Sequence, residues 1–385
     1  MHRTRRDPID TARSDRVTPT AADVIRRLAE VGLKPPRSVT LAVTNRCNLS
    51  CRHCWPDSGP DENAPVVPKN RVLRLMDGFS ALGAEKLVIT GGEPLTHPDW
   101  FEMLSYACTR PGIREVRLQT NAILITPAHV EALLSLKDRG LFIQTSLEGA
   151  TAAYHDWVRG PGSFDRTLAG LRLLEKSGMA PRICITFTEM RHNLEDIPDL
   201  LKLAGDMGIG RFVTGTLVSR GRAAAPGGPE PPTPAQYAAL VSRYQRDRTF
   251  RDRYDAIGNI AALEWFLGTA RAAGTCCTFI ETPYVTAEGR LHPCVMLHAD
   301  DFAATEVYNR PVTAAISEKI ASWSRLQQIS GSRLTRLAAC KVCPDYARCG
   351  AGCMGRAYSA HGDFFSVEDR CRLRKTVYRR RRAEE

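Results

Sequence analysis

The 385-residue sequence lacks any run of about 18 apolar residues, which excludes a membrane-spanning helix. No apolar segment follows the basic N-terminus, so the chain does not begin with a secretory signal peptide. The composition also excludes a disordered chain, because 43% of the residues are hydrophobic and 25% are charged. We therefore expect a cytoplasmic globular protein that does not associate with membranes.

The chain has little excess charge outside its two ends. The formal net charge is +11, of which residues 1–16 carry +2 and residues 370–385 carry +6, so the 353 residues between hold only +3. A charged terminal segment is usually solvated, so this distribution disfavours nucleic acid as a partner. The alternative is a metal-bound nucleic-acid module that uses the Arg379–Arg382 run.

Short β-branched runs alternate with segments of helical periodicity from residue 39 onward. The predicted strands are 39–44, 86–90, 116–120, 141–147, 182–188 and 211–217, and the predicted helices are 69–82, 99–108, 126–138, 163–177 and 194–207. Ser163 is predicted to cap its helix, and Pro127 suits a first helical position. Each return from strand to parallel strand needs a crossover, so the pattern predicts an α/β fold with a partial (β/α)6 barrel of the TIM type.

A composition change separates this region from the rest of the chain. Residues 223–234 hold five Pro and two Gly, which is typical of a linker or exposed loop. A helical segment is expected over about 235–272, and a hairpin over 283–294 that turns at Glu288-Gly289.

The thirteen cysteines are concentrated in two parts of the chain. Cys47, Cys51 and Cys54 fall in a loop after the first strand, eight more lie between 276 and 371, and only Cys108 and Cys184 stand alone. Clustered cysteines in a reducing compartment usually bind metal or do chemistry. Three thiolates could hold a [4Fe–4S] cube with one open iron, or zinc with a fourth ligand such as His53.

The Cys47-x3-Cys51-x2-Cys54 loop and the Gly91-Gly92-Glu93-Pro94 turn after the second strand resemble the radical S-adenosylmethionine (SAM) superfamily. The resemblance implies that the three cysteines hold a SAM-binding [4Fe–4S] cluster. It also implies that the glycines approach the methionine part of SAM and that Glu93 fixes its amino group. The same resemblance suggests Ser146 and Arg159 for the SAM carboxylate, and Asn121 and Glu148 for the ribose or methionine. These motifs follow strand ends, where barrel enzymes build their sites.

The second cysteine group resembles the SPASM extension of related enzymes. By that resemblance one auxiliary [4Fe–4S] cluster takes four cysteines and a second takes the remainder, giving three clusters in all. The first set is Cys340, Cys343, Cys349 and Cys371, and the second is Cys294, Cys353 and the pair Cys276 and Cys277. A zinc ribbon of Cys340, Cys343, Cys349 and Cys353 is the alternative, although it would leave Cys294 and Cys371 unexplained.

The expected organisation has five parts. They are a basic extension with one helix (1–38), the radical SAM partial barrel (39–222), a linker with a helical connection (223–273), the small SPASM domain (274–375) and a basic tail (376–385). The first part is too short for a leader-binding domain. No catalytic acid, base or radical-relay residue follows from the motifs, and Tyr284, His292, His298 and Asp300 are merely near an auxiliary ligand in sequence.

The resemblance implies a radical SAM oxidoreductase or maturase that makes a 5′-deoxyadenosyl radical and abstracts hydrogen from its substrate. The leading hypothesis for the substrate is a ribosomally synthesised peptide or a protein. A small molecule such as a tetrapyrrole or another cofactor precursor is the alternative. Expected partners are an electron donor such as flavodoxin or ferredoxin, and a separate leader-recognition protein.

Overall fold

The structure is a computed structural model that describes residues 18–270 and 279–385. Nine strands form one sheet: β1 Ser38–Ala42, β2 Lys86–Thr90, β3 Glu115–Thr120, β4 Leu141–Ser146, β5 Ile183–Glu189, β6 Arg211–Thr216, β7 Gly258–Asn259, β8 Tyr284–Val285 and β9 Leu291–His292. Their order is β7-β6-β5-β4-β3-β2-β1-β8-β9, and every neighbouring pair is parallel except β8 and β9. The predicted α/β partial barrel is confirmed.

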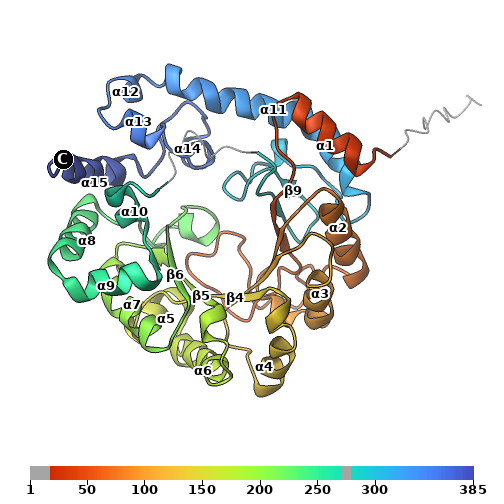
Figure 1. The fold of residues 1–385 in the computed structure, drawn as a ribbon, viewed down its shortest axis with the longest axis horizontal. Helices are drawn as coiled ribbons and strands as arrows, with labels where there is room; N and C mark the ends of the chain where they lie inside the picture. The colour runs from red at the N-terminus through yellow and green to blue at the C-terminus, as the bar shows by residue number, and fades with distance from the viewer. Residues whose placement is uncertain (1–17, 271–278) are drawn as a thin grey trace, which may run out of the picture.

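Helices follow the strands on the outside of the curved sheet (Figure 1). The α-helices of the barrel are α1 Ala21–Glu30, α2 Lys69–Ala81, α3 Trp100–Ala107, α4 Pro127–Leu134, α5 Ala152–Arg159, α6 Ser163–Lys176, α7 Ile197–Asp206, α8 Pro234–Arg246, α9 Arg248–Ile257 and α10 Ala261–Leu267. The predicted starts at Pro127 and Ser163 agree with the structure. Ser163 is not the cap, however. The Asp156 carboxylate accepts hydrogen bonds from the Gly162 and Phe164 amides and from the Ser163 hydroxyl instead.

The segment expected to be one helical connection is divided and returns to the sheet. α8 ends at Arg246 and α9 at Ile257, after which β7 pairs with β6 before α10 begins. The pattern of residues 235–272 gave no sign of β7, because two residues are too few to show a period.

The C-terminal region contains α11 Val312–Arg336, α12 Ala338–Lys341, α13 Tyr346–Cys349, α14 Met354–His361 and α15 Cys371–Arg382. The hairpin predicted at 283–294 is present as β8 and β9. Residues 376–382 are not a separate tail, because α15 continues through them and buries Val377 and Tyr378. The basic end of the chain is therefore partly anchored in the core.

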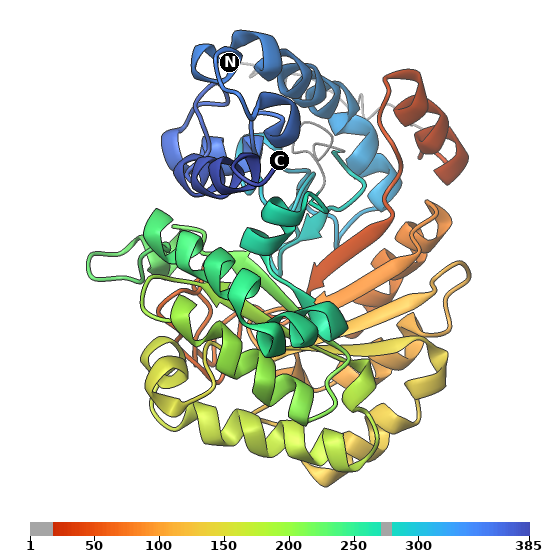
Figure 2. The same ribbon diagram turned by 60° about the vertical axis from the view of Figure 1, so that its left-hand side comes forward.

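The C-terminal helices close the open side of the sheet. α11 packs beside α1 and α2, while α15 packs on α8 and α10, so the region touches both edges of the barrel (Figures 1 and 2). A single apolar core links the strands to these helices through side chains such as Trp323 and Val377. No helix in the described part of the chain is long and apolar enough to cross a membrane.

Gly170 of α6 lets this helix lie against the turn that follows β3. A Cβ atom at Gly170 would lie 2.1 Å from the Ala122 carbonyl oxygen, and Ala122 is itself held at a φ of 63°. We expect Gly170→Ala to lower the free energy of unfolding by about 1–3 kcal/mol through overpacking. Urea unfolding followed by circular dichroism measures this change.

Gly205→Ala in α7 is the matched control for this variant. Nothing lies within 4 Å of a Cβ atom added there, so the helix should gain up to about 1 kcal/mol from the better helix former. Equal stabilisation of both variants would contradict the close contact between α6 and Ala122.

Candidate active site

The loop that follows β1 brings three thiols to the wall of one cavity. Cys47 and Cys51 are buried, Cys54 is partly buried, and all three line the cavity. Two short hydrogen bonds shape the loop: the Cys47 amide donates to the Gly59 carbonyl at 2.8 Å, and the Cys54 amide donates to the Cys51 carbonyl at 3.2 Å. No disulfide joins the cysteines among the described residues, so these thiols are available as ligands.

The Gly91-Gly92-Glu93 segment lies against the start of this loop. The Gly92 amide donates to the Thr44 carbonyl at 2.7 Å, and the Glu93 amide donates to the Arg46 carbonyl at 2.8 Å. A Cβ atom at Gly91 would lie 2.5 Å from the Thr44 oxygen, and one at Gly92 would lie 2.3 Å from the Arg46 oxygen. The glycines are therefore required for the approach of residues 44–46, in addition to any role toward a ligand.

Glu93 joins the end of β2 to the end of β3. Its carboxylate accepts hydrogen bonds from the Thr120 hydroxyl (2.8 Å), the Asn121 amide (2.7 Å) and the Leu95 amide (3.0 Å). The side chain is 1% exposed, and burial raises its pKa to about 7 in spite of these hydrogen bonds. Pro94 begins the short 3-10 helix η1 (Pro94–Thr96) and is buried outside the cavity lining.

Asn121 and Ser146 also line the cavity, at the ends of β3 and β4. The Asn121 side-chain amide donates to Asn48 Oδ1 at 2.7 Å, which ties the turn after β3 to the cysteine loop. Ser146 Oγ lies 3.1 Å from Thr186 Oγ1 on the neighbouring strand. Both residues thus line the same cavity as the three thiols.

Glu148 was predicted to contact the ribose or methionine, but the structure places it beneath the cavity wall. Its side chain is fully buried, and one oxygen lies 2.7 Å from Arg159 Nη2 and 3.3 Å from His53 Nε2. The other oxygen accepts from the Thr188 amide at 2.8 Å. Burial alone would raise the pKa of Glu148, but Arg159 and His53 hold it well below its usual range. Glu148 is therefore a positioning residue for Arg159, which does line the cavity.

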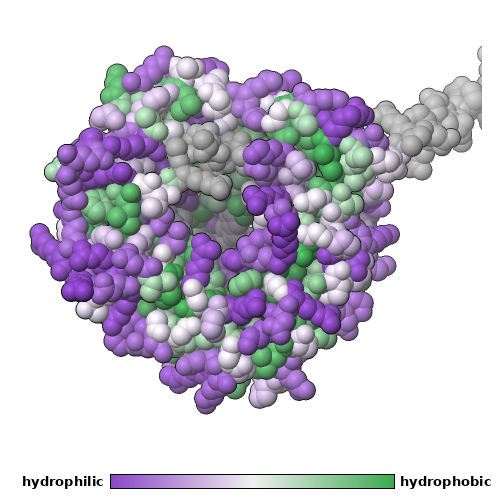
Figure 3. Space-filling model, in the orientation of Figure 1, coloured by the Kyte–Doolittle hydropathy of each residue, from purple (hydrophilic) through white to green (hydrophobic). Residues whose placement is uncertain are grey.

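The cavity has a volume of about 600 Å³ and lies at the carboxyl ends of the strands. The space-filling view shows the molecule hollowed on this face (Figure 3). Three arginines in its lining were not predicted from the sequence, namely Arg222, Arg356 and Arg370. Arg222 donates to the carbonyls of Cys51 (2.8 Å) and Ser58 (2.6 Å), so it clamps the cysteine loop from the far side of the barrel.

Arg356 connects the C-terminal region to the barrel. It is 3% exposed and donates to the Thr216 and Leu217 carbonyls at the end of β6, at 3.2 Å and 2.6 Å. Asp369 pairs with the same guanidinium at 2.5 Å. Because Val295 and Met296 also line the cavity, the C-terminal region supplies part of its wall.

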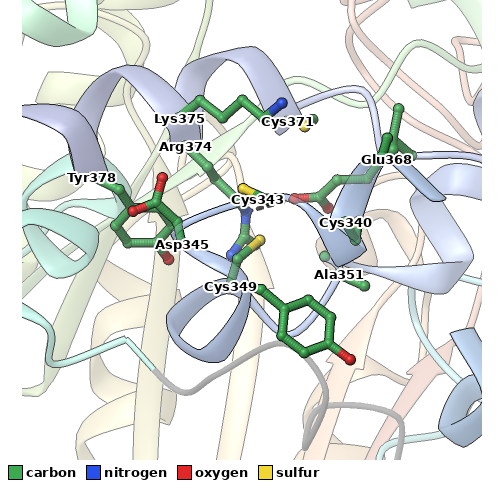
Figure 4. A pocket seen from close by; sticks show the side chains of 14 residues that line it. Cys340, Cys343, Asp345, Cys349, Ala351, Glu368, Cys371, Arg374, Lys375 and Tyr378 are labelled. Atoms are coloured by element: carbon green, nitrogen blue, oxygen red, sulfur yellow. Dashed lines mark ion pairs between the residues drawn. The ribbon is translucent and has the colours of Figure 1, made fainter. Parts of the chain in front are cut away.

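A second group of cysteines surrounds a small pocket of about 30 Å³ in the C-terminal region. Cys340, Cys343, Cys349 and Cys371 all line it, together with Asp345, Glu368, Arg374 and Lys375 (Figure 4). Cys353 does not, although the zinc-ribbon alternative requires it beside the first three. The predicted partners of Cys353 are Cys294 and the pair Cys276 and Cys277, and this pair lies outside the described residues.

A buried carboxylate organises the surroundings of the four-cysteine pocket. Glu368 lies 2.5 Å from Arg374 Nε and 2.9 Å from Arg370 Nη2, and it accepts from the Cys353 amide at 2.9 Å. Burial would raise the pKa of Glu368, but the two arginines hold it below the ordinary value. This network links the pocket to Cys353 and, through Arg370, to the central cavity.

The donor sets fit iron–sulfur chemistry. Three thiols on one wall leave one position of a [4Fe–4S] cube open, whereas the four thiols around the second pocket can saturate a cube. Glycines at close approach, a buried acid and polar strand ends surround the three-thiol site. The fold and the site therefore define an α/β-barrel protein with a cysteine-lined cavity whose donor set suits an incompletely ligated iron–sulfur cluster.

Comparisons with known proteins agree with this class. The family model for the radical SAM superfamily matches residues 41–204. The chain is 30% identical to the AdoMet-dependent heme synthase of Methanosarcina barkeri over 87% of this chain and 96% of that protein. It is 28% identical to mycofactocin maturase MftC of Mycobacterium ulcerans over 86% of each chain. The structure of anSMEcpe with bound AdoMet superposes with a TM-score of 0.70 over 91% of this chain and 94% of that one, at 17% identity.

The chain belongs to the radical SAM superfamily and, within it, to the enzymes with a SPASM domain. Its cofactors are accordingly SAM and a [4Fe–4S] cluster. When both are bound, the cluster and SAM would supply the one-electron chemistry by which SAM is cleaved and hydrogen is abstracted from a substrate. The protein binds and orients the two cofactors and excludes water from them.

Glu93 gives this site a pH-dependent contribution to stability. Its ordinary pKa of 4.5 rises to about 7 on folding, so the folded protein binds more protons than the unfolded chain between these values. Stability must then fall as the pH rises from about 4.5 to 7. Without SAM, the free energy of unfolding of the wild type should fall by roughly 3 kcal/mol over this pH range relative to that of Glu93→Gln. Urea unfolding at a series of pH values measures this difference. A constant difference between the two proteins would contradict this assignment.

Proposed function

We propose that Cys47, Cys51 and Cys54 hold the SAM-binding cluster, and that SAM lies in the central cavity beside it. The observation that carries this proposal is the contact between the cysteine loop and the Gly91–Glu93 segment at the cavity wall. Asn121, Ser146 and Arg159 face the same space and would bind the polar groups of SAM. Glu93, hydrogen-bonded to the strand ends, would fix the SAM amino group from the buried side.

The C-terminal region would hold two auxiliary [4Fe–4S] clusters. The convergence of Cys340, Cys343, Cys349 and Cys371 on one pocket supports the first of them. Cys294, Cys353 and the pair Cys276 and Cys277 would hold the second. Clusters of this kind need a reducing compartment, so the cytoplasm is part of the proposal.

Anaerobic reconstitution with iron and sulfide tests the cluster assignment. Three cubes correspond to about twelve irons per chain. Replacing Cys47, Cys51 and Cys54 together by Ser should remove about four irons and abolish the formation of 5′-deoxyadenosine from SAM under dithionite. Replacing Cys340, Cys343 and Cys371 together should also remove about four irons, while the SAM-binding cluster keeps its electron paramagnetic resonance signal.

Cys108→Ser is the control, since this thiol stands apart from both groups in the sequence and lines neither site. It should keep both the iron content and SAM cleavage. SAM cleavage that survives in the first triple variant would refute the assignment. About one zinc per chain that is lost with Cys353→Ser but kept with Cys371→Ser would favour the zinc-ribbon arrangement.

For the substrate, we propose a peptide or protein whose side chain enters the central cavity. The cavity volume of about 600 Å³ must hold the cluster and SAM as well as the substrate, so only part of it remains for the substrate. That space suits one side chain better than a whole macrocycle. Mycofactocin maturase MftC, similar over 86% of this chain, is a relative named for such a reaction. A separate leader-recognition protein and an electron donor such as flavodoxin or ferredoxin complete this proposal.

A small-molecule substrate is the second candidate, and the similarity to a heme synthase at 30% identity over nearly its whole length favours it. The two candidates differ in what they consume. Incubating the reduced holoenzyme and SAM with a precursor peptide encoded beside the gene should change the peptide mass, as measured by mass spectrometry. A parallel incubation contains a tetrapyrrole in place of the peptide. Decarboxylation or oxidation of the tetrapyrrole, together with an unchanged peptide mass in the first incubation, would favour the small-molecule substrate.

A further inference from the structure

α15 carries a row of unpaired cations on its outer face. Arg372, Lys375 and Arg379 are exposed and are spaced three and four residues apart, so they lie on one side of the helix. The opposite side buries Leu373, Val377 and Tyr378 against the core. The exposed row is therefore held in place by a packed helix and is not a flexible tail.

These cations are distinct from the other basic residues at this end of the chain. Arg374, Arg381 and Arg382 pair with Glu368, Glu385 and Asp345. No ion pair within the described part of the chain involves Arg372, Lys375 or Arg379, and the same holds for Lys341. Four positive charges thus have no ion-pair partner among residues 18–270 and 279–385.

The row lies beside the four-cysteine pocket. Lys375 lines that pocket together with Cys340, Cys343 and Cys371 (Figure 4). Between Cys340 and Cys343 the chain exposes Lys341 and Val342, and Val342 is 85% exposed, the most exposed of the large hydrophobic side chains described. We call Lys341, Val342, Arg372, Lys375 and Arg379 the basic patch. The basic patch thus contains one exposed apolar side chain and four cations, of which Lys375 lines the four-cysteine pocket.

We propose that the basic patch is the docking surface for a small acidic electron-carrier protein of the flavodoxin or ferredoxin kind. This inference rests on the auxiliary cluster proposed for the four cysteines. Electron-carrier complexes have small interfaces in which complementary charge guides encounter, and an apolar centre within a charged rim suits them. Docking on the patch would set the redox group of the carrier next to the four thiols.

Nucleic acid fits the patch less well than an acidic protein. The patch contains no aromatic side chain on which a base could stack. One of its cations, Lys375, lines the four-cysteine pocket, and Lys341 and Arg372 directly follow the pocket cysteines Cys340 and Cys371 in the chain. The adjoining arginines Arg381 and Arg382, which would lengthen a basic track for a phosphate backbone, are already paired with carboxylates.

The test compares the binding of purified flavodoxin to the reconstituted holoenzyme and to two charge-reversal variants. Lys341→Glu, Arg372→Glu and Arg379→Glu together should raise the Kd about tenfold or more at about 0.1 M ionic strength, and should remove most of its salt dependence. The control is Arg166→Glu, Arg172→Glu and Lys176→Glu on α6, which reverses two exposed arginines and one exposed lysine at the other end of the molecule. It should leave the Kd within about twofold.

Each outcome decides between alternatives. The neutral set Lys341→Gln, Arg372→Gln and Arg379→Gln should give an intermediate Kd, which excludes misfolding of the reversed variant as the cause. Equal affinity of the patch variant and the wild type would overturn the docking site, and so would an RNA oligonucleotide that binds the patch more tightly than flavodoxin. SAM cleavage by the wild type under dithionite reports separately on the proposed function, because dithionite needs no docking surface.

Discussion

Two backbone hydrogen bonds between residues 44–46 and residues 91–93 hold the site together. They continue the pairing of β1 with β2 past the ends of both strands, into the loop that carries Cys47, Cys51 and Cys54. The approach is possible only without side chains at Gly91 and Gly92, because a Cβ atom at either would overlap a carbonyl oxygen. Glu93 then fixes the turn after β3, and Asn121 returns from that turn to the cysteine loop through Asn48. Three strand ends are thus locked to one loop.

The parts of the molecule that sequence predicts well are those in which local pattern and chemistry coincide. β2 has the predicted bounds, because KLVIT is a buried run that ends at a glycine turn. The candidate residues at strand ends reach one cavity because parallel strands end on the same side of the sheet. Glu148 shows the limit of this reasoning. The family resemblance implied a ligand contact for it, but its carboxylate pairs with Arg159 and His53 and does not line the cavity.

Contacts between segments that are far apart in the chain could not be predicted from the sequence either. Arg222 and Arg356 complete the cavity by donating to main-chain carbonyls of distant loops, and no residue pattern marks which carbonyl an arginine will reach. The 25-residue helix α11 was not predicted either, although Ile316, Ile320 and Trp323 recur at helical spacing and are buried. Its buried side chains are nevertheless what join the C-terminal region to α1 and α2. The fold of that region depends on ordinary apolar packing as much as on its cysteines.

The charges of the central cavity constrain what its substrate can be. Arg159, Arg222, Arg356 and Arg370 all line it, which suggests at first a site for an acidic molecule. Each of them, however, is paired with a carboxylate, namely Glu148, Asp57, Asp369 and Glu368 respectively. The guanidinium groups therefore serve chiefly to fix loops and to bridge the barrel to the C-terminal region, and the wall is polar without a large net charge. Such a wall can bind the zwitterionic methionine end of SAM, but it does not by itself select an acidic substrate, so substrate choice must depend on shape and on contacts outside the cavity.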